Sequence, residues 1–107
     1  MKKLRYLNPF FIRNAVRDIR RVFADGRPRL VRVVAVGHPE GFFVPTSTIE
    51  IEVEGKNGRK ERFCPLIPIP WPYAWAWRIA RRLGVPLVRD VEPEHFGVAL
   101  PLRRGSR

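Results

Sequence analysis

The chain has few residues of the types that form covalent cross-links or bind metals. Its 107 residues include one cysteine, Cys64, and two histidines, His38 and His95. A single cysteine excludes a disulfide within the chain, and disulfides belong to oxidising compartments, so the sequence predicts a cytoplasmic protein. No cofactor and no metal are expected, because the spacing of these residues matches no known ligand motif.

Acidic residues are also scarce, with 10 Asp and Glu against 21 Lys and Arg and a net charge of +11. Residues 1–36 hold ten of the cations and two of the acids, a net +8. Residues 37–70 have a net charge of −1, and residues 71–107 have +4. Positive charge concentrated at the two ends of the chain does not indicate a particular fold. It does favour an anionic binding partner.

Long hydrophobic runs are missing as well. The longest uncharged stretch, residues 63–77, contains four prolines and falls short of the roughly 20 apolar residues that a membrane-spanning helix requires. The basic opening residues resemble the start of a signal peptide, but Asn8, Pro9 and Arg13 interrupt any apolar segment behind them. We therefore expect neither a transmembrane segment nor a signal peptide.

The remaining composition is that of a globular protein. Hydrophobic residues make up 45% of the chain, which is enough to bury one modest core in a chain of this length. We expect residues 1–102 to form a single α+β domain and residues 103–107 to form a basic flexible tail.

The first expected element is an amphipathic helix near the N-terminus. Asn8 is a suitable cap, Pro9 suits the first helical position, and Gly26 followed by Pro28 ends the pattern. At 100° per residue one face is apolar and the adjacent face is basic. The apolar face holds Ile12, Ala15, Val16, Ile19, Val22 and Phe23, and the basic face holds Arg13, Arg17, Arg20 and Arg21.

A β-hairpin is the clearest local prediction. Residues 48–54 alternate between β-branched residues and glutamates, and residues 56–58 supply a turn with Gly58 in the left-handed region. The register that follows places Glu54 opposite Lys60, Glu52 opposite Arg62 and Ile51 opposite Phe63. Residues 30–36 are expected to form a further strand before it.

After the hairpin, a proline-rich connector leads to a second, aromatic-rich helix at residues 73–83, which Gly84 and Pro86 terminate. Residues 85–88 are predicted to form a short C-terminal strand, and residues 96–102 a further edge strand. The order of elements favours an α+β fold in which a small antiparallel sheet, built around the central hairpin, carries both helices on one face.

The basic face of the first helix is the main candidate for a binding surface. Guanidinium groups bind phosphate oxygens bidentately, and Arg27, Arg29 and Arg32 extend the patch. The alternative is a packed helix whose arginines are only solvated. A second contact surface is predicted on the aromatic-rich helix. It would contain Arg78, Arg81 and Arg82 with Trp71, Trp75 and Trp77.

The three indoles exceed what the narrow apolar stripe of that helix can bury, so we expect one or two to be partly exposed. An exposed indole suits base stacking, a membrane interface or a protein contact, whereas a buried one fills the core. Evidence for catalysis is weak. His38, Glu40, Cys64, Glu92, Glu94 and His95 form no recognisable catalytic or metal motif, and the chain has no glycine-rich phosphate loop.

The sequence therefore predicts a non-enzymatic polyanion-binding module, with nucleic acid as the preferred partner and weak sequence specificity. The alternative is an accessory subunit of a larger assembly, in one version membrane-associated, that uses the basic helix and exposed tryptophans as contact surfaces. The two differ in the apolar face of the first helix, which lipid binding requires to be free and nucleic-acid binding leaves packed.

Overall fold

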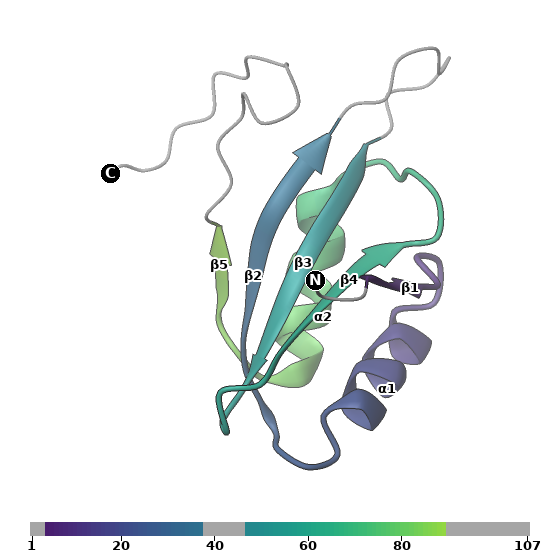
Figure 1. Ribbon diagram of the computed structural model, residues 1–107. Coiled ribbons are helices and arrows are strands. Elements are labelled where there is room, and N and C mark those ends of the chain that lie inside the picture. Colours follow the sequence, from purple (N-terminus) through teal and green to yellow (C-terminus); the bar gives the residue numbers. More distant parts are fainter. Residues whose placement is uncertain (1–3, 38–46, 90–107) are drawn as a thin grey trace.

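The computed structural model describes residues 4–37 and 47–89, which form five strands and two helices (Figure 1). In chain order these are β1 (Leu4–Leu7), α1 (Ile12–Val22), β2 (Pro28–Gly37), β3 (Thr48–Gly55), β4 (Lys60–Pro65), α2 (Pro72–Leu83) and β5 (Leu87–Arg89).

The strands form one mixed sheet in the order β1-β4-β3-β2-β5. β2, β3 and β4 make an antiparallel meander, while β1 pairs in parallel with β4 and β5 pairs in parallel with β2. The prediction of an antiparallel sheet is therefore wrong. Each helix serves as a crossover connection, α1 between β1 and β2 and α2 between β4 and β5, and such connections join parallel strands.

β1 is the element that the sequence analysis missed. It has four residues, too few for a periodic signal, and its partners at Arg62–Pro65 lie far along the chain. The backbone N–H of Leu66 also donates to the carbonyl of Leu7 at 2.9 Å. At the other edge, β5 lies at residues 87–89 rather than 85–88. The strand predicted at residues 96–102 and the tail at 103–107 lie outside the described residues.

The predicted hairpin is confirmed. Glu54 lies opposite Lys60, Glu52 opposite Arg62 and Ile51 opposite Phe63. Gly58 has φ 88°, the left-handed conformation that the turn requires and that glycine adopts at little cost. Local sequence is sufficient here because turn chemistry and the alternation on both strands specify the same register.

α1 begins three residues later than predicted. Asn8 does not cap it: its Oδ1 accepts a hydrogen bond from the N–H of Phe10 at 2.9 Å, in the turn between β1 and the helix. Phe11 is the N-cap and makes no side-chain capping bond. Because residues up to Leu7 belong to β1, the chain needs residues 8–11 to reverse direction before a helix can start.

α2 begins at Pro72, whose missing N–H costs nothing at the first helical position, with Trp71 as the N-cap. Gly84 ends the helix at φ 74°, as predicted. Within the described residues, neither helix is both long enough and apolar enough to cross a membrane.

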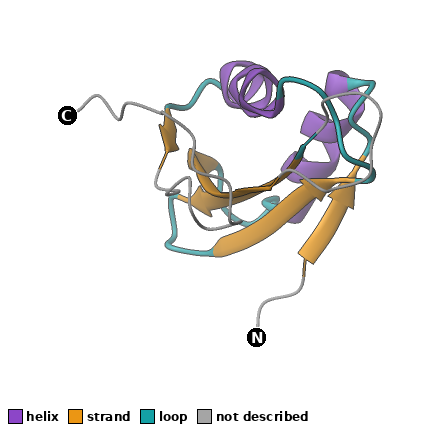
Figure 2. Ribbon diagram, turned by 90° about the horizontal axis from the view of Figure 1, so that it is seen from above, coloured by secondary structure: helices purple, strands orange, loops and turns teal. Residues whose placement is uncertain are grey.

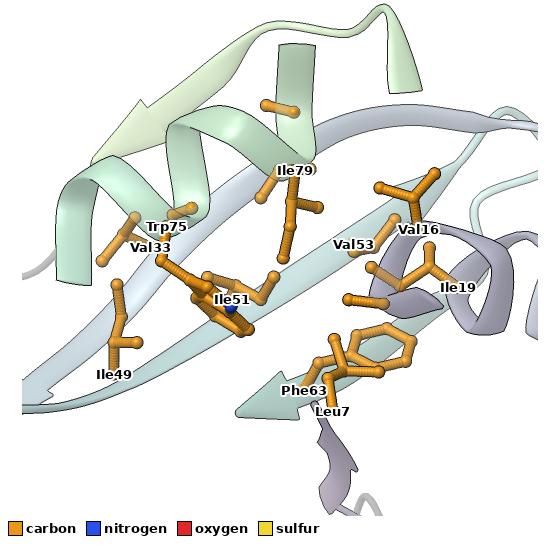
Figure 3. Packing of buried hydrophobic residues seen from close by; sticks show 14 of the residues in the cluster. Leu7, Val16, Ile19, Val33, Ile49, Ile51, Val53, Phe63, Trp75 and Ile79 are labelled. Atoms are coloured by element: carbon orange, nitrogen blue, oxygen red, sulfur yellow. The ribbon is translucent and has the colours of Figure 1, made fainter. Parts of the chain in front are cut away.

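Both helices lie on the same face of the sheet (Figure 2). Their apolar sides and the inner side of the strands form one buried cluster (Figure 3). Ala15, Val16, Ile19 and Phe23 of the predicted apolar face of the first helix are buried in it. On the sheet, Val31, Val33, Ile51, Val53 and Phe63 are fully buried, and Ala76, Ile79 and Ala80 of α2 are buried against β2 and β3.

Replacement of Phe63 tests this core. Its side chain is completely buried where β4 faces α1, so Phe63→Ala removes packing on all sides and should reduce the free energy of unfolding by about 3–5 kcal/mol. Phe11→Ala, at an exposed phenylalanine, should cost far less. Urea denaturation of both variants measures the difference, and equal destabilisation would contradict the described core.

Candidate functional site

Carboxylates are concentrated on the sheet and at the hairpin. Of the six in the described residues, five pair with arginines of the strands or of the hairpin turn, and the sixth is Asp18 of α1. On the sheet, Arg29 Nη2 lies 2.7 Å from Glu54 Oε2, and Arg62 Nη1 lies 2.8 Å from Glu50 Oε1. The hydrogen bond from Arg29 lowers the pKa of Glu54 below its ordinary value. The sheet thus neutralises most of its own charge.

The side chain of Arg59 in the hairpin forms hydrogen bonds with the C-terminal end of α1 and with two carboxylates near it. Its Nη1 donates to the carbonyl of Val22 at 3.0 Å and to Asp25 at 3.0 Å, and its Nε donates to Glu61 at 2.9 Å. Glu61 also accepts from Arg5 at 3.4 Å. These contacts attach the hairpin to the end of the helix, and they leave Asp18 as the acid on the helix surface itself.

A groove of about 860 Å³ runs along α1 beside α2, and five arginines line it. Asn14, Val16 and Ala24 also line it, and none of the described lining residues carries a carboxylate. The packing of both helices on one sheet face places the basic side of α1 next to the end of α2. We name this feature the arginine groove, defined by Arg13, Arg17, Arg20, Arg21 and Arg82.

The charges of the arginine groove are weakly compensated. Asp18 Oδ1 lies 3.7 Å from Arg17 Nε and 3.9 Å from Arg21 Nη1, and all three side chains are exposed, so these pairs contribute little. Arg13 and Arg82 make no side-chain ion pair with any other described residue. Four predicted helix arginines therefore lie together on one surface, largely without counter-charge from the described part of the chain.

Arg20 has a second role. Its Nη2 donates to the carbonyl of Arg82 at 3.0 Å, which satisfies one of the last carbonyls of α2 and places a cation at the negative end of that helix. The bond joins the C-terminal ends of the two helices and positions the Arg20 guanidinium in the groove.

A second groove, of about 680 Å³, continues around the end of the helices. Arg20 and Ala24 belong to both grooves, and Arg27 and Lys56 add positive charge. Arg29 also lines the second groove, but its guanidinium is paired with Glu54, so it contributes little to the predicted patch. Lys56 was not predicted as a site residue. Its backbone N–H donates to the carbonyl of Arg27 at 2.8 Å, a contact that depends on the pairing of β2 with β3 and has no local sequence signal.

Arg32 does not belong to this surface. Val31 and Val33 face the helices, so strand alternation directs Arg32 to the opposite face of the sheet. There its Nη1 lies 3.2 Å from Glu52 Oε1 and 3.5 Å from Glu54 Oε1. Its role is to neutralise the glutamates of β3.

The structure also separates the arginines predicted to form a second contact surface. Arg82 lies in the arginine groove, whereas Arg78 lines a different cleft near the start of α2. The Arg81 guanidinium lies over the Trp77 ring at 5.1 Å from its centroid. Arg78 and Arg82, one helical turn apart, thus line two different hollows beside α1, whereas Arg81 stacks on Trp77.

The tryptophans divide between core and surface. Trp75 is 4% exposed, and its Nε1 has no hydrogen-bond partner among the described residues. Trp71 is 78% exposed and Trp77 is 49% exposed. Trp71 lies at the mouth of the cleft that Arg78 lines.

The described residues contain no group of three or more His, Cys, Asp or Glu side chains able to hold a metal ion. Five of the residues weighed for catalysis, His38, Glu40, Glu92, Glu94 and His95, lie outside the described part of the chain. Cys64 is partly buried on β4, and burial, with a smaller effect of Glu50, raises the pKa of its thiol from 9.0 to about 11. Comparisons with family models, with curated proteins and with solved structures gave no match.

The raised pKa of Cys64 predicts slow alkylation. The thiolate is the nucleophile, and at pH 8 a pKa of about 11 leaves roughly 100-fold less thiolate than a pKa of 9.0. Iodoacetamide should therefore modify the native protein about 100-fold more slowly than the urea-unfolded protein. The native rate should also rise about tenfold per pH unit between pH 8 and pH 10. A native rate equal to the unfolded rate at pH 8 would refute the described environment of Cys64.

Proposed function

We propose that the protein is a non-enzymatic polyanion-binding module whose partner is nucleic acid, bound with weak sequence specificity. The observation that carries the proposal is the arginine groove, which gathers five guanidiniums in a concave surface where no carboxylate of residues 4–37 or 47–89 is among the lining side chains. Planar, permanently charged guanidiniums bind phosphate oxygens bidentately.

The spacing of the groove arginines suits a phosphate backbone. Arg13 and Arg21 are eight residues apart on α1, which at 1.5 Å per residue separates them by roughly 12 Å along the axis. One nucleic-acid strand presents a phosphate about every 3.4 Å of duplex axis, so about three or four phosphates fall within this length. Several contacts can therefore form at once.

Weak sequence specificity follows from the type of contact. Phosphate contacts position a protein on nucleic acid but do not read its bases. The lining side chains that the structure describes are arginines, one asparagine and small apolar residues, which suit phosphate contacts rather than acid–base catalysis. A cytoplasmic location belongs to the proposal, and the single cysteine supports it.

The second candidate is an accessory subunit of a larger protein assembly, favoured by the exposed Trp71 and Phe10. Its membrane-associated version loses support, because Ala15, Val16 and Ile19 of the apolar face of α1 are packed in the core and are not available to lipid. A protein partner would bind through apolar contact and would show little dependence on salt.

The salt dependence of binding tests the proposal. For a labelled duplex, log K should fall linearly with log salt concentration, with a slope near −0.9 for each phosphate neutralised and about −4 for the whole groove. Arg17→Gln should reduce the magnitude of the slope by about one. Lys60→Gln is the matched control, since it removes the same charge from the opposite face of the sheet.

Charge reversal gives the stronger test. Changing Arg13, Arg17, Arg20 and Arg21 to Glu should abolish binding while circular dichroism shows a folded domain, because these side chains are exposed. The proposal is wrong if the folded reversal variant binds as tightly as the parent, or if Lys60→Gln weakens binding as much as Arg17→Gln.

A further inference from the structure

A cleft of about 320 Å³ opens where the two helices begin. It is largely apolar, and its lining includes Phe10, Ile12, Trp71, Ala74, Trp75 and Arg78. Phe10 is 70% exposed and Trp71 is 78% exposed, so two aromatic side chains at this cleft present most of their surface to solvent. Within the two helices Trp77 is the one large apolar side chain that is exposed, and the exposed pair Phe10 and Trp71, which precede the helices, contributes little to the core.

The backbone fixes Trp71 in this position. It has φ 50° and ψ 60°, and among the described residues it is the one non-glycine residue with a positive φ. Pro70 and Pro72 flank it and restrict the chain further. Its carbonyl accepts the first helical hydrogen bond, from the N–H of Trp75 at 3.2 Å. Glycine or asparagine would adopt this conformation at lower cost, and such strain is concentrated at binding sites.

The cleft and the arginine groove lie along the same junction between the helices. The two helices run in the same direction beside each other (Figure 1). Ile12 and Ala74, near the starts of the helices, line the cleft, and the C-terminal ends meet at the Arg20–Arg82 hydrogen bond. Ile12 lines the cleft, and the next residue, Arg13, lines the groove. A ligand that occupies both would meet aromatic rings at one end and guanidiniums along the rest.

We infer that the nucleic acid bound is single-stranded, with one or two bases stacked on Trp71 and Phe10 and the adjoining phosphates in the arginine groove. This inference rests on the proposed function. Single strands offer unpaired base faces next to phosphates, and proteins bind them by combining aromatic platforms with a basic groove. A duplex keeps its base faces stacked within the helix and would leave the cleft unused.

Charge favours this occupant over an apolar protein segment. The cleft itself includes Arg78, and the neighbouring groove is lined by five arginines and by no carboxylate of the described residues. An apolar peptide filling the cleft would leave these charges without partners, whereas a polynucleotide matches both parts.

The experiment compares a fluorescein-labelled oligothymidylate with a duplex of equal length, by anisotropy at constant low salt. The parent should bind the single strand more tightly than the duplex. Trp71→Leu and Phe10→Leu should each weaken single-strand binding about tenfold, since one lost stack has that effect. Both should leave duplex binding and the salt slope unchanged. Phe11→Leu is the control, because Phe11 is an exposed aromatic residue that does not line the cleft.

The outcomes are distinguishable. If the duplex binds as tightly as the single strand, or if Trp71→Leu and Phe10→Leu bind the single strand like Phe11→Leu, the inference is overturned while phosphate binding by the groove stands. If the parent binds neither probe at low salt, the proposed function fails and the inference fails with it. Because both side chains are exposed, circular dichroism should show parent-like folding for each variant.

Discussion

The requirement that both helices bury their apolar sides against one face of the sheet determines the rest of this structure. Each helix connects two parallel strands by passing over the strands between them, and both crossovers use the same face (Figure 2). The helices must therefore lie next to each other. The arginines that flank the apolar stripe of α1 cannot enter the core, so they line the groove beside α2.

The distribution of charge makes this groove basic. The sheet and hairpin use nearly all described carboxylates in their own ion pairs, from Arg62 with Glu50 to Arg59 with Asp25. The helices keep Asp18, whose contacts are long and exposed. A surface on which acidic and basic side chains alternate would bind a polyanion weakly. Here the described acids lie mostly on the sheet and hairpin, so the arginines of the helices give one face a concentrated positive potential. This supports the proposed binding of phosphates along the junction of the helices.

Local patterns predicted much of the fold and part of the site. The hairpin register follows from alternation and turn chemistry, and the clustering of Arg13, Arg17, Arg20 and Arg21 follows from helical periodicity. The mixed sheet, β1 and the groove contributions of Arg82 and Lys56 depend on contacts between distant segments. The position of Arg32 could not be predicted for the same reason. It lies away from the basic surface because the helices cover the other face of β2. Neighbours in sequence indicate a side chain's direction within its element, but not what lies opposite that element.

Phosphate binding in the arginine groove can be tested most directly by two-dimensional NMR. The titration follows the Nε–Hε signals of individual arginines while a short single-stranded oligonucleotide is added. We expect the signals of Arg13, Arg17, Arg21 and Arg82 to shift together with one affinity. The signals of Arg32, Arg59 and Arg62, which are held in ion pairs of the sheet and hairpin, should not shift. Shifts confined to the sheet arginines, or spread equally over all of them, would contradict this expectation.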